Sequence, residues 1–299
     1  MGALNHDSPA EIRAVLERRG IGLKKRWGQN FLVNRGARER LVSLLEPPPG
    51  GLAWEIGPGL GAMTGLLLAR GARVVAFEVD HGICRFLVEE ELAGSSGLTL
   101  VEGDFLRTWR EALERHGPPD VVLGNLPYRS ASLMIAEIVT GGVRPLRSIF
   151  TVQRELAERL TAVPRTKSYS SFSILCGSCF RIRGKGDLQP GSFWPAPEVV
   201  SSVVELVPLE GAPSGSELEM LSRVTRALFA ARRKTIRNNA VAAFGQEVLP
   251  VLERQRIDPT LRAEDLEPRD FIGLARALAE AERLARQDRA RPDGDGPSV

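Results

Sequence analysis

Short apolar segments alternate with helix-patterned segments between residues 52 and 152. The apolar segments are rich in β-branched residues, whereas the segments between them have helical periodicity or composition. This alternation predicts βαβ units, and therefore a mostly parallel sheet with helices on both faces. The predicted strands are Leu52–Ile56, Arg73–Phe77, Leu98–Val101, Val121–Gly124 and Ser148–Val152. The predicted helices are Ala62–Arg70, Gly82–Leu92, Leu106–Arg115 and Ser132–Val139.

Two further apolar segments, Phe172–Ile182 and Val199–Val207, follow this region and are separated by stretches rich in Gly and Pro. They predict a hairpin at the far edge of the sheet. The predicted fold class is therefore α/β, with a doubly wound, Rossmann-like domain built on a mostly parallel sheet.

A change of composition divides the chain after this sheet. Residues 208–216 are rich in Pro, Gly and Ser, which is typical of a linker, and only helical patterns follow. The predicted helices there are Glu217–Ala231, Ala240–Leu252 and Arg269–Arg286. We expect four regions: a peripheral extension with one amphipathic helix over 1–20, the α/β domain over 21–210, a small all-helical domain over 216–286, and a disordered tail over 287–299.

The composition is that of a globular protein that can bury a sizeable core. Of 299 residues, 43% are hydrophobic and 26% are charged, which excludes a mainly disordered or fibrous chain. No apolar run approaches the roughly 18 residues that a membrane helix needs, and residues 1–20 lack the apolar region of a signal peptide. Three cysteines are too few for a disulfide scaffold, so we expect a cytoplasmic protein in a reducing compartment.

The cysteines and histidines do not predict a metal site. Cys176 and Cys179 frame a short motif, but it lies in a predicted strand, and no second cysteine pair or nearby histidine completes four ligands. Nothing pairs the three histidines with a nucleophile, so a triad hydrolase is not expected. We therefore predict no metal.

Positive charge is concentrated in two segments, although the net charge is only +3. Residues 21–40 hold six basic residues against one acidic residue, and residues 221–240 hold six with none. This segregation predicts an electropositive face that could contact a phosphate backbone. The alternative is a set of ordinary solvated helix faces.

The first strand-to-helix turn contains three glycines, in the segment Glu55-Ile56-Gly57-Pro58-Gly59-Leu60-Gly61. Glycine lets the backbone approach a ligand closely at the start of a helix, where the backbone amides face it. Read as Gly57, Gly59 and Ala62, the spacing fits a dinucleotide site; read with Glu55, it is typical of an S-adenosylmethionine site. The turn alone leaves both cofactors open.

Two acidic residues follow the next predicted strands. Glu78 ends the second strand, 21 residues after Gly57, where a carboxylate can accept hydrogen bonds from a cofactor ribose. Asp104 follows the third strand and could accept from an adenine amino group, with Phe105 beside the ring. The simpler interpretation for each is a helix N-cap, but three suitable strand ends in series favour a cofactor site.

The segment Gly124-Asn125-Leu126-Pro127-Tyr128, directly after the fourth strand, predicts methyl transfer to adenine N6. The lone pair of this nitrogen is delocalised into the ring. Two acceptors, the Asn125 side-chain carbonyl and the Leu126 backbone carbonyl, would favour a pyramidal nitrogen with a localised lone pair. Pro127 stiffens the turn, and Tyr128 offers a face on which a base can stack.

The sequence resembles the KsgA/Erm class of rRNA adenine N6-dimethyltransferases over about residues 24–282, and is most similar to the KsgA branch. The residues that carry the resemblance are Gly28–Leu32, Glu55–Gly61, Gly103-Asp104, Asn125–Tyr128, Phe193–Val199 and Arg232–Asn238. The last of these favours the KsgA branch over the resistance-type Erm enzymes.

The resemblance implies cofactor contacts at Asn30, Leu32, Gly57, Glu78, Asp104 and Asn125, to which we add Gly59 and Phe105. It also implies that Phe193 closes over the target base opposite Tyr128. The chain departs from the family pattern at Arg129-Ser130, which alters the expected entry path of the nucleotide, and at Phe105, where alanine is commoner.

Together these observations predict an S-adenosylmethionine-dependent enzyme that dimethylates two adjacent adenines in small-subunit rRNA during ribosome biogenesis. Its partner would be rRNA in the small subunit or its precursor, with no membrane, and the protein would be a monomer. The residues expected to contact RNA phosphates are Lys24, Lys25, Arg26, Arg233, Lys234 and Arg237. The alternatives are a non-catalytic nucleic-acid-binding factor on the same fold, an Erm-type large-subunit enzyme, and a dehydrogenase. The dehydrogenase is disfavoured because this sequence lacks the residues expected for hydride transfer.

Overall fold

The computed structural model describes residues 4–24 and 27–290. The chain divides into two compact units. The first runs through Thr161 and resumes over Phe180–Pro208, and the second comprises Ala162–Cys179 and the described residues from Leu209 onward. The helical unit therefore includes a segment of 18 residues that sequence analysis assigned to the α/β domain.

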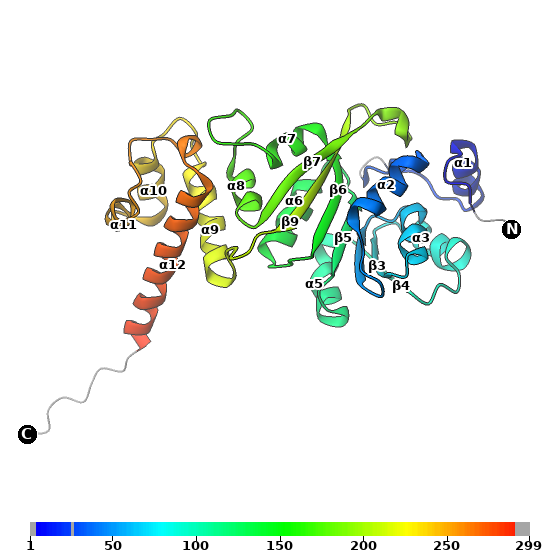
Figure 1. The fold of residues 1–299 in the computed structure, drawn as a ribbon, viewed down its shortest axis with the longest axis horizontal. Coiled ribbons are helices and arrows are strands. Elements are labelled where there is room, and N and C mark those ends of the chain that lie inside the picture. Colours follow the sequence, from blue (N-terminus) through cyan, green and yellow to red (C-terminus); the bar gives the residue numbers. More distant parts are fainter. Residues whose placement is uncertain (1–3, 25–26, 291–299) are drawn as a thin grey trace, which may run out of the picture. The chain divides into compact units, whose positions relative to one another are not determined.

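The first unit is built on a seven-stranded sheet with the order β4-β3-β2-β5-β6-β9-β7 (Figure 1). Strands β2 to β6 are parallel, whereas β9 is antiparallel to both β6 and β7. This confirms the doubly wound α/β fold with an antiparallel hairpin at one edge. The strands are β2 (Leu52–Ile56), β3 (Arg73–Glu78), β4 (Leu98–Glu102), β5 (Val121–Asn125), β6 (Arg147–Gln153), β7 (Phe180–Leu188) and β9 (Ser201–Pro208).

Helices cover both faces of this sheet because successive side chains of each strand point to opposite sides. Ala53 packs in a core cluster with Leu41 and Leu67 from two helices on one face. Trp54, the next residue, meets Phe77 and Phe105 edge-on on the other face. The helices of this unit after residue 30 are α2 (Arg35–Leu45), α3 (Ala62–Ala69), α4 (His81–Phe86) with the π-helical turn η2 (Leu87–Glu91), α5 (Phe105–His116), α6 (Ala131–Thr140) and α7 (Arg154–Leu160).

The N-terminal segment packs into the first unit, where we expected a peripheral extension. Helix α1 (Pro9–Arg18) buries Ile12, Val15 and Leu16 in a cluster with Phe86 and other residues of the α4 region. The chain then forms β1 (Phe31–Leu32), which pairs with β8 (Phe193–Trp194) after the short 3-10 helix η3 (Pro190–Ser192). The amphipathic helix is confirmed, but its apolar face belongs to the core.

The predicted strand Phe172–Ile182 is wrong over most of its length. Helix α8 (Ser171–Gly177) occupies it, and β7 begins only at Phe180. A capping box explains the helix, because the Ser170 hydroxyl accepts from the backbone N–H of Ser173 and the Ser173 hydroxyl accepts from that of Ser170. Cys176 and Cys179 are thus at a helix end and its turn, where both are buried.

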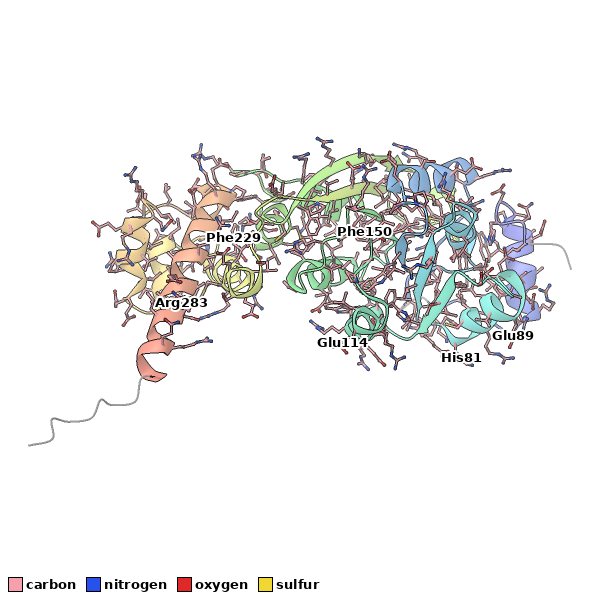
Figure 2. All side chains as sticks on the ribbon, turned by 60° about the horizontal axis from the view of Figure 1, so that its bottom comes forward. His81, Glu89, Glu114, Phe150, Phe229 and Arg283 are labelled. Atoms are coloured by element: carbon pink, nitrogen blue, oxygen red, sulfur yellow. The ribbon has the colours of Figure 1, made fainter. Side chains whose placement is uncertain are left out.

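The second unit holds α8 and four further helices: α9 (Gly215–Leu228), α10 (Ile236–Phe244), α11 (Val248–Arg254) and α12 (Pro268–Ala290), with the 3-10 turn η4 (Ala263–Asp265). Its core contains Phe229, which lies against the rings of Tyr169 and Phe271. Figure 2 shows Phe229 among these helices and Phe150 within the sheet of the first unit.

Several helix bounds differ from prediction by a few residues, and two differences in the second unit are larger. The helix expected over Ala240–Leu252 is two helices, because Gly245 ends α10 with a φ of 78°. A disordered tail was expected from residue 287, but α12 continues to Ala290, and the remainder of the expected tail, residues 291–299, lies outside the described residues. None of the helices in the described part of the chain is long and apolar enough to cross a membrane.

Candidate active site

The chain reverses direction across the sheet between β2 and β5. From β2 it proceeds outward to β3 and β4, and then crosses back to β5 on the other side of β2. Ligands of open α/β sheets bind in the crevice at such a reversal, beyond the carboxyl ends of the strands. A cavity of about 330 Å³ lies there in the first unit, lined by residues that follow β2, β3, β4 and β5.

The glycine turn after β2 forms one wall of this cavity. Gly57, Gly59 and Gly61 have φ values of 73°, 54° and 91°, which residues other than glycine rarely adopt. A Cβ on Gly59 would lie 3.1 Å from the ring of Phe31, which also lines the cavity. The sequence therefore needs glycine here for backbone conformation and for close approach.

Glu78 ends β3 and lines the cavity, as predicted from its position in the sequence. Its side chain is only 6% exposed, and one carboxylate oxygen accepts from the backbone N–H of Asp80 at 2.9 Å. Burial raises the pKa of Glu78 to about 7, although hydrogen bonds from the backbone of Asp80, Val79 and Gly59 oppose this shift.

Glu55 is a second buried carboxyl group, but it does not line the cavity. Burial raises its pKa to about 7, the Thr64 hydroxyl donates to it at 2.6 Å, and the charge of Glu78 raises its pKa further. Its other oxygen has no hydrogen-bond partner among the described residues.

Asp104 is the N-cap of α5, and its place at the cavity leaves its predicted contact with the adenine amino group open. Its carboxylate accepts from the backbone N–H of Leu106 at 3.0 Å and so caps α5, and it also lines the cavity. Phe105 lies beside it, is almost fully buried, and packs edge-on against Phe77 with ring centroids 5.1 Å apart. The cavity therefore has an acidic acceptor next to an aromatic wall.

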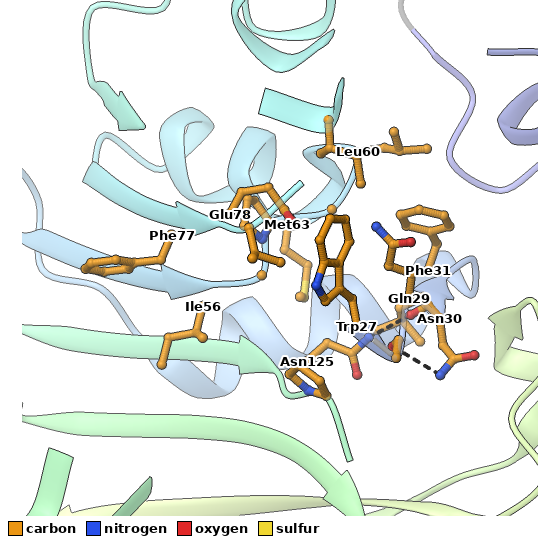
Figure 3. Close-up of a pocket in the computed structure, with 18 of the residues that line it drawn as sticks. Trp27, Gln29, Asn30, Phe31, Ile56, Leu60, Met63, Phe77, Glu78 and Asn125 are labelled. Carbon is orange, nitrogen blue, oxygen red and sulfur yellow. Dashed lines mark hydrogen bonds between the residues drawn. The ribbon is translucent and has the colours of Figure 1, made fainter. Parts of the chain in front are cut away.

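Asn125 ends β5 on the opposite side of the glycine turn, and its side-chain N–H donates to the backbone carbonyl of Asn30 at 2.8 Å (Figure 3). The amide group is planar, so this bond from one of its two N–H groups fixes the direction in which its acceptor, Oδ1, points. Pro127 and the exposed Arg129 also line the cavity, so the unusual Arg129 does lie beside it.

Residues 27–32 close the cavity from the N-terminal side. Figure 3 shows Trp27, Gln29, Asn30 and Phe31 around it, opposite Met63 and Glu78. Of these, only the roles of Asn30 and Leu32 were predicted. Several residues that line the cavity were not predicted to belong to a site. They include Trp27 and Met63, His6 and Ile12 near the N-terminus, and Arg38 on α2. Nothing in the spacing of His6 or Arg38 pointed to a site.

Three predicted catalytic residues do not line the cavity. Leu126 is buried, and its backbone N–H donates to Thr151 at 3.0 Å. Tyr128 is tethered through its hydroxyl to that of Ser201 at 2.6 Å. The ring of Phe193 is 3% exposed and packs in the core cluster that contains Leu32, so the structure does not place it at the cavity.

The predicted RNA-binding residues fall into two groups. Lys24 lies near the cavity, where its ammonium is 3.9 Å from the centre of the Trp27 ring and 3.6 Å from the Asp80 carboxylate. Lys25 and Arg26 lie outside the described residues. In the second unit Arg233, Lys234 and Arg237 are exposed, and no described carboxylate lies within ion-pair distance of them.

Arg232, which belongs to the same basic segment, has a structural role. It donates to the backbone carbonyl of Tyr169 at 2.9 Å and lies 3.6 Å from Glu264. Asn239 likewise donates to the carbonyls of Leu228 and Ala231 at the end of α9. The basic segment therefore combines internal contacts with three cations that have no ion-pair partner in the described part of the chain.

The chain matches the family described as ribosomal RNA adenine dimethylase over residues 21–280. A ribosomal RNA small subunit methyltransferase A from Treponema denticola is 40% identical over 277 residues, which cover 91% of this chain and 94% of that protein. A protein of the same name from Borreliella burgdorferi is 34% identical, covering 92% and 95%.

Solved structures agree with the fold. The crystal structure of a dimethyladenosine transferase from Plasmodium falciparum superimposes with a TM-score of 0.71 at 22% identity, covering 84% of this chain and 97% of that one. The structure of the 23S rRNA methyltransferase ErmE gives a TM-score of 0.60 at 23% identity, covering 83% and 99%. From the match over most of its length and from its curated relatives, this chain belongs to the ribosomal RNA adenine dimethylase family.

Proposed function

We propose that this protein transfers methyl groups from S-adenosylmethionine to N6 of two adjacent adenines in small-subunit rRNA. The relatives named above are small-subunit methyltransferases, which favours this substrate over large-subunit rRNA. We also propose that it acts as a monomer in the cytoplasm, on rRNA of the small subunit or its precursor.

The cavity fits S-adenosylmethionine in size and in chemistry. Its volume is in the range of small-molecule sites, and the glycine turn brings the backbone close to a ligand. Glu78 would accept hydrogen bonds from the ribose hydroxyls, and Asp104 from the adenine amino group, with Phe105 against the ring. Asn30, Leu32 and Asn125 would surround the methionine part.

The orientation of Asn125 is the observation that carries the proposal. One of its two N–H groups donates to the Asn30 carbonyl and so holds the planar amide in one orientation, in which Oδ1 would accept from the target amine. With the Leu126 carbonyl as the second acceptor, the amine would be held pyramidal with its lone pair localised. Bound S-adenosylmethionine supplies the activated methyl group, and the protein contributes mainly orientation and exclusion of water. Extrusion of the adenine from its stack would bring it to this site.

Transfer of labelled methyl groups to isolated ribosomal subunits tests the proposal. We expect incorporation into rRNA of small subunits that lack this modification, and none into large subunits. Incorporation only into large-subunit rRNA would identify an Erm-type enzyme instead. No incorporation by a protein that binds the cofactor would favour the non-catalytic factor.

Affinity for S-adenosylmethionine should rise with pH, because the pKa of Glu78 is raised to about 7. The carboxyl group is neutral below this pH, and its ionised form accepts hydroxyl hydrogen bonds better and attracts the cationic cofactor. If only the ionised form binds, the dissociation constant should fall by about tenfold between pH 6 and pH 8. Isothermal titration calorimetry at several pH values measures this.

Glu55 and Asp80 are the acidic groups that face Glu78, and Glu55 provides the control. Burial raises the pKa of Glu55 to the same range, but Glu55 does not line the cavity. Glu55→Gln should therefore keep the pH dependence, whereas Glu78→Gln should abolish it. A flat profile in the wild-type protein would show that Glu78 does not contact the cofactor.

The basic segment of the second unit should bind RNA backbone through Arg233 and Arg237. Each phosphate contact releases about 0.7–0.9 of a counterion, so replacing both residues by Gln should reduce the log–log salt slope of RNA binding by roughly 1.5. Arg276→Gln with Arg283→Gln is the matched control, since these arginines of the same unit are paired with Glu217 and Glu280. An equal change of slope in both double variants would contradict a specific role for Arg233 and Arg237.

A further inference from the structure

The N-terminal residues form part of the cavity wall, although they precede the segment that matches the family. His6 and Ile12 line the cavity, and the family match begins at residue 21. His6 is fixed to η2, because its Nε2 lies 3.0 Å from a carboxylate oxygen of Glu91, whose other oxygen accepts from the backbone N–H of Leu4 at 3.3 Å. The wall they form is therefore attached to the α/β domain by polar contacts.

Arg38, on α2, joins this N-terminal wall to the segment that contains Leu32. Its side chain is 6% exposed and lines the cavity. One guanidinium nitrogen donates to the Leu32 carbonyl at 2.7 Å and to the His6 carbonyl at 3.4 Å, and the other donates to the Asp7 carboxylate. Three separate parts of the chain thus meet at one guanidinium group.

A buried guanidinium is stable only when it is paired and hydrogen-bonded, and its removal leaves the partners unsatisfied. Arg38→Met would leave the Leu32 carbonyl and the Asp7 carboxylate without this partner. Arg35, on the same helix, differs in each respect: it is 73% exposed, pairs with Glu39, and does not line the cavity. Arg38 is therefore placed to act on the cavity, and Arg35 is not.

We propose that Arg38 is a positioning residue that holds Asn30–Leu32 in the conformation that binds the methionine part of S-adenosylmethionine. This inference rests on the proposed cofactor. The segment is held by Asn125 at the Asn30 carbonyl and by Arg38 at the Leu32 carbonyl. Glu78, Asp104 and Phe105 lie on other strand ends, at the proposed ribose and adenine positions. Loss of Arg38 should therefore affect one end of the cofactor.

Two ligands distinguish this role from a general loss of stability. S-adenosylhomocysteine carries the amino-acid part, and 5′-methylthioadenosine lacks it. In calorimetric titrations Arg38→Met should weaken S-adenosylhomocysteine by about tenfold, because a hydrogen bond from a charged group no longer holds the Leu32 carbonyl in the binding conformation. Binding of 5′-methylthioadenosine should change by less than about twofold, and KM for S-adenosylmethionine should rise more than kcat falls.

Companion variants complete the test. Arg38→Lys should recover part of the affinity because it keeps a donor, Asp7→Asn should show a smaller loss of the same selectivity, and Arg35→Met should bind both ligands as the wild type does. Asp7 is at the surface, so its variant remains informative if Arg38→Met fails to fold. Equal weakening of the two ligands, or no weakening, would overturn the role of Arg38. Failure of the wild-type protein to bind either ligand would instead refute the proposed cofactor, and this inference with it.

Discussion

Replacement of Asn125 by alanine is expected to lower kcat by a factor of about 10² to 10³. The side-chain carbonyl would be one of two acceptors for the target amine, and loss of one such transition-state contact costs about 3–4 kcal/mol. The group is well placed for this, because its N–H is held by the Asn30 carbonyl at the end of β5. Single-turnover methylation of small subunits at saturating cofactor measures the effect.

The variant should keep its fold, since Asn125 lies at a strand end and is only partly buried. A thermal melt and a titration with S-adenosylhomocysteine serve as controls for folding and for cofactor binding. If Asn125→Ala retains more than about a tenth of the wild-type kcat, the role assigned to this side chain is wrong.

Glu78→Ala is expected to weaken S-adenosylmethionine by between about tenfold and a hundredfold, while RNA affinity stays unchanged. A buried charged acceptor of hydrogen bonds contributes about 1.5–3 kcal/mol to binding. Calorimetry at pH 8 is the suitable measurement, because burial raises the pKa of Glu78 to about 7 and the group is then ionised.

Glu102→Ala is the matched control for this experiment. Glu102 pairs in register with Glu78 on the neighbouring strand β4, but its side chain is half exposed, pairs with His81, and does not line the cavity. Cofactor affinity should be unaffected by its loss. Equal affinity of Glu78→Ala and the wild type would place the ribose elsewhere.

The central parallel strands of the sheet could be predicted from sequence because they are buried on both faces. Strand β2 has the predicted bounds, Leu52–Ile56, and every residue of it is buried. A strand of this kind appears as a continuous apolar run between turn residues. The predicted strands also fix where their carboxyl ends lie, which is why Gly57, Glu78, Asp104 and Asn125 could be assigned to one edge of the sheet.

The strand predicted over Phe172–Ile182 was wrong because local hydrogen bonds favour a helix there. The run Phe172–Ile182 has a strand composition, yet the side chains of Ser170 and Ser173 start a helix within it. A capping box stabilises only the start of a helix. Its effect counts here because a short apolar run has no strong preference between helix and strand. Contacts within the second unit then decide the outcome, as the hydrogen bond from Tyr169 to the Leu266 carbonyl illustrates.

The parts of the site that sequence analysis missed depend on contacts between distant residues. Arg38 appeared as one charge in a basic segment, and its pairing with Asp7 joins residues 31 positions apart. His6 lines the cavity and contacts Glu91, which is 85 positions away in the sequence. Phe193 matches a family motif and is buried in the cluster that contains Leu32, and its place over the target base stays a prediction.

Mass spectrometry of oligonucleotides from treated rRNA tests the proposed activity most directly. Small subunits from cells that lack this protein would be incubated with the wild-type protein and S-adenosylmethionine, and the rRNA would be digested to oligonucleotides, whose fragments locate each modified nucleoside. We expect N6,N6-dimethyladenosine to appear at two adjacent positions of the small-subunit rRNA, with Asn125→Ala as the inactive control. Unmodified rRNA after incubation with wild-type protein that binds the cofactor would contradict the proposed function.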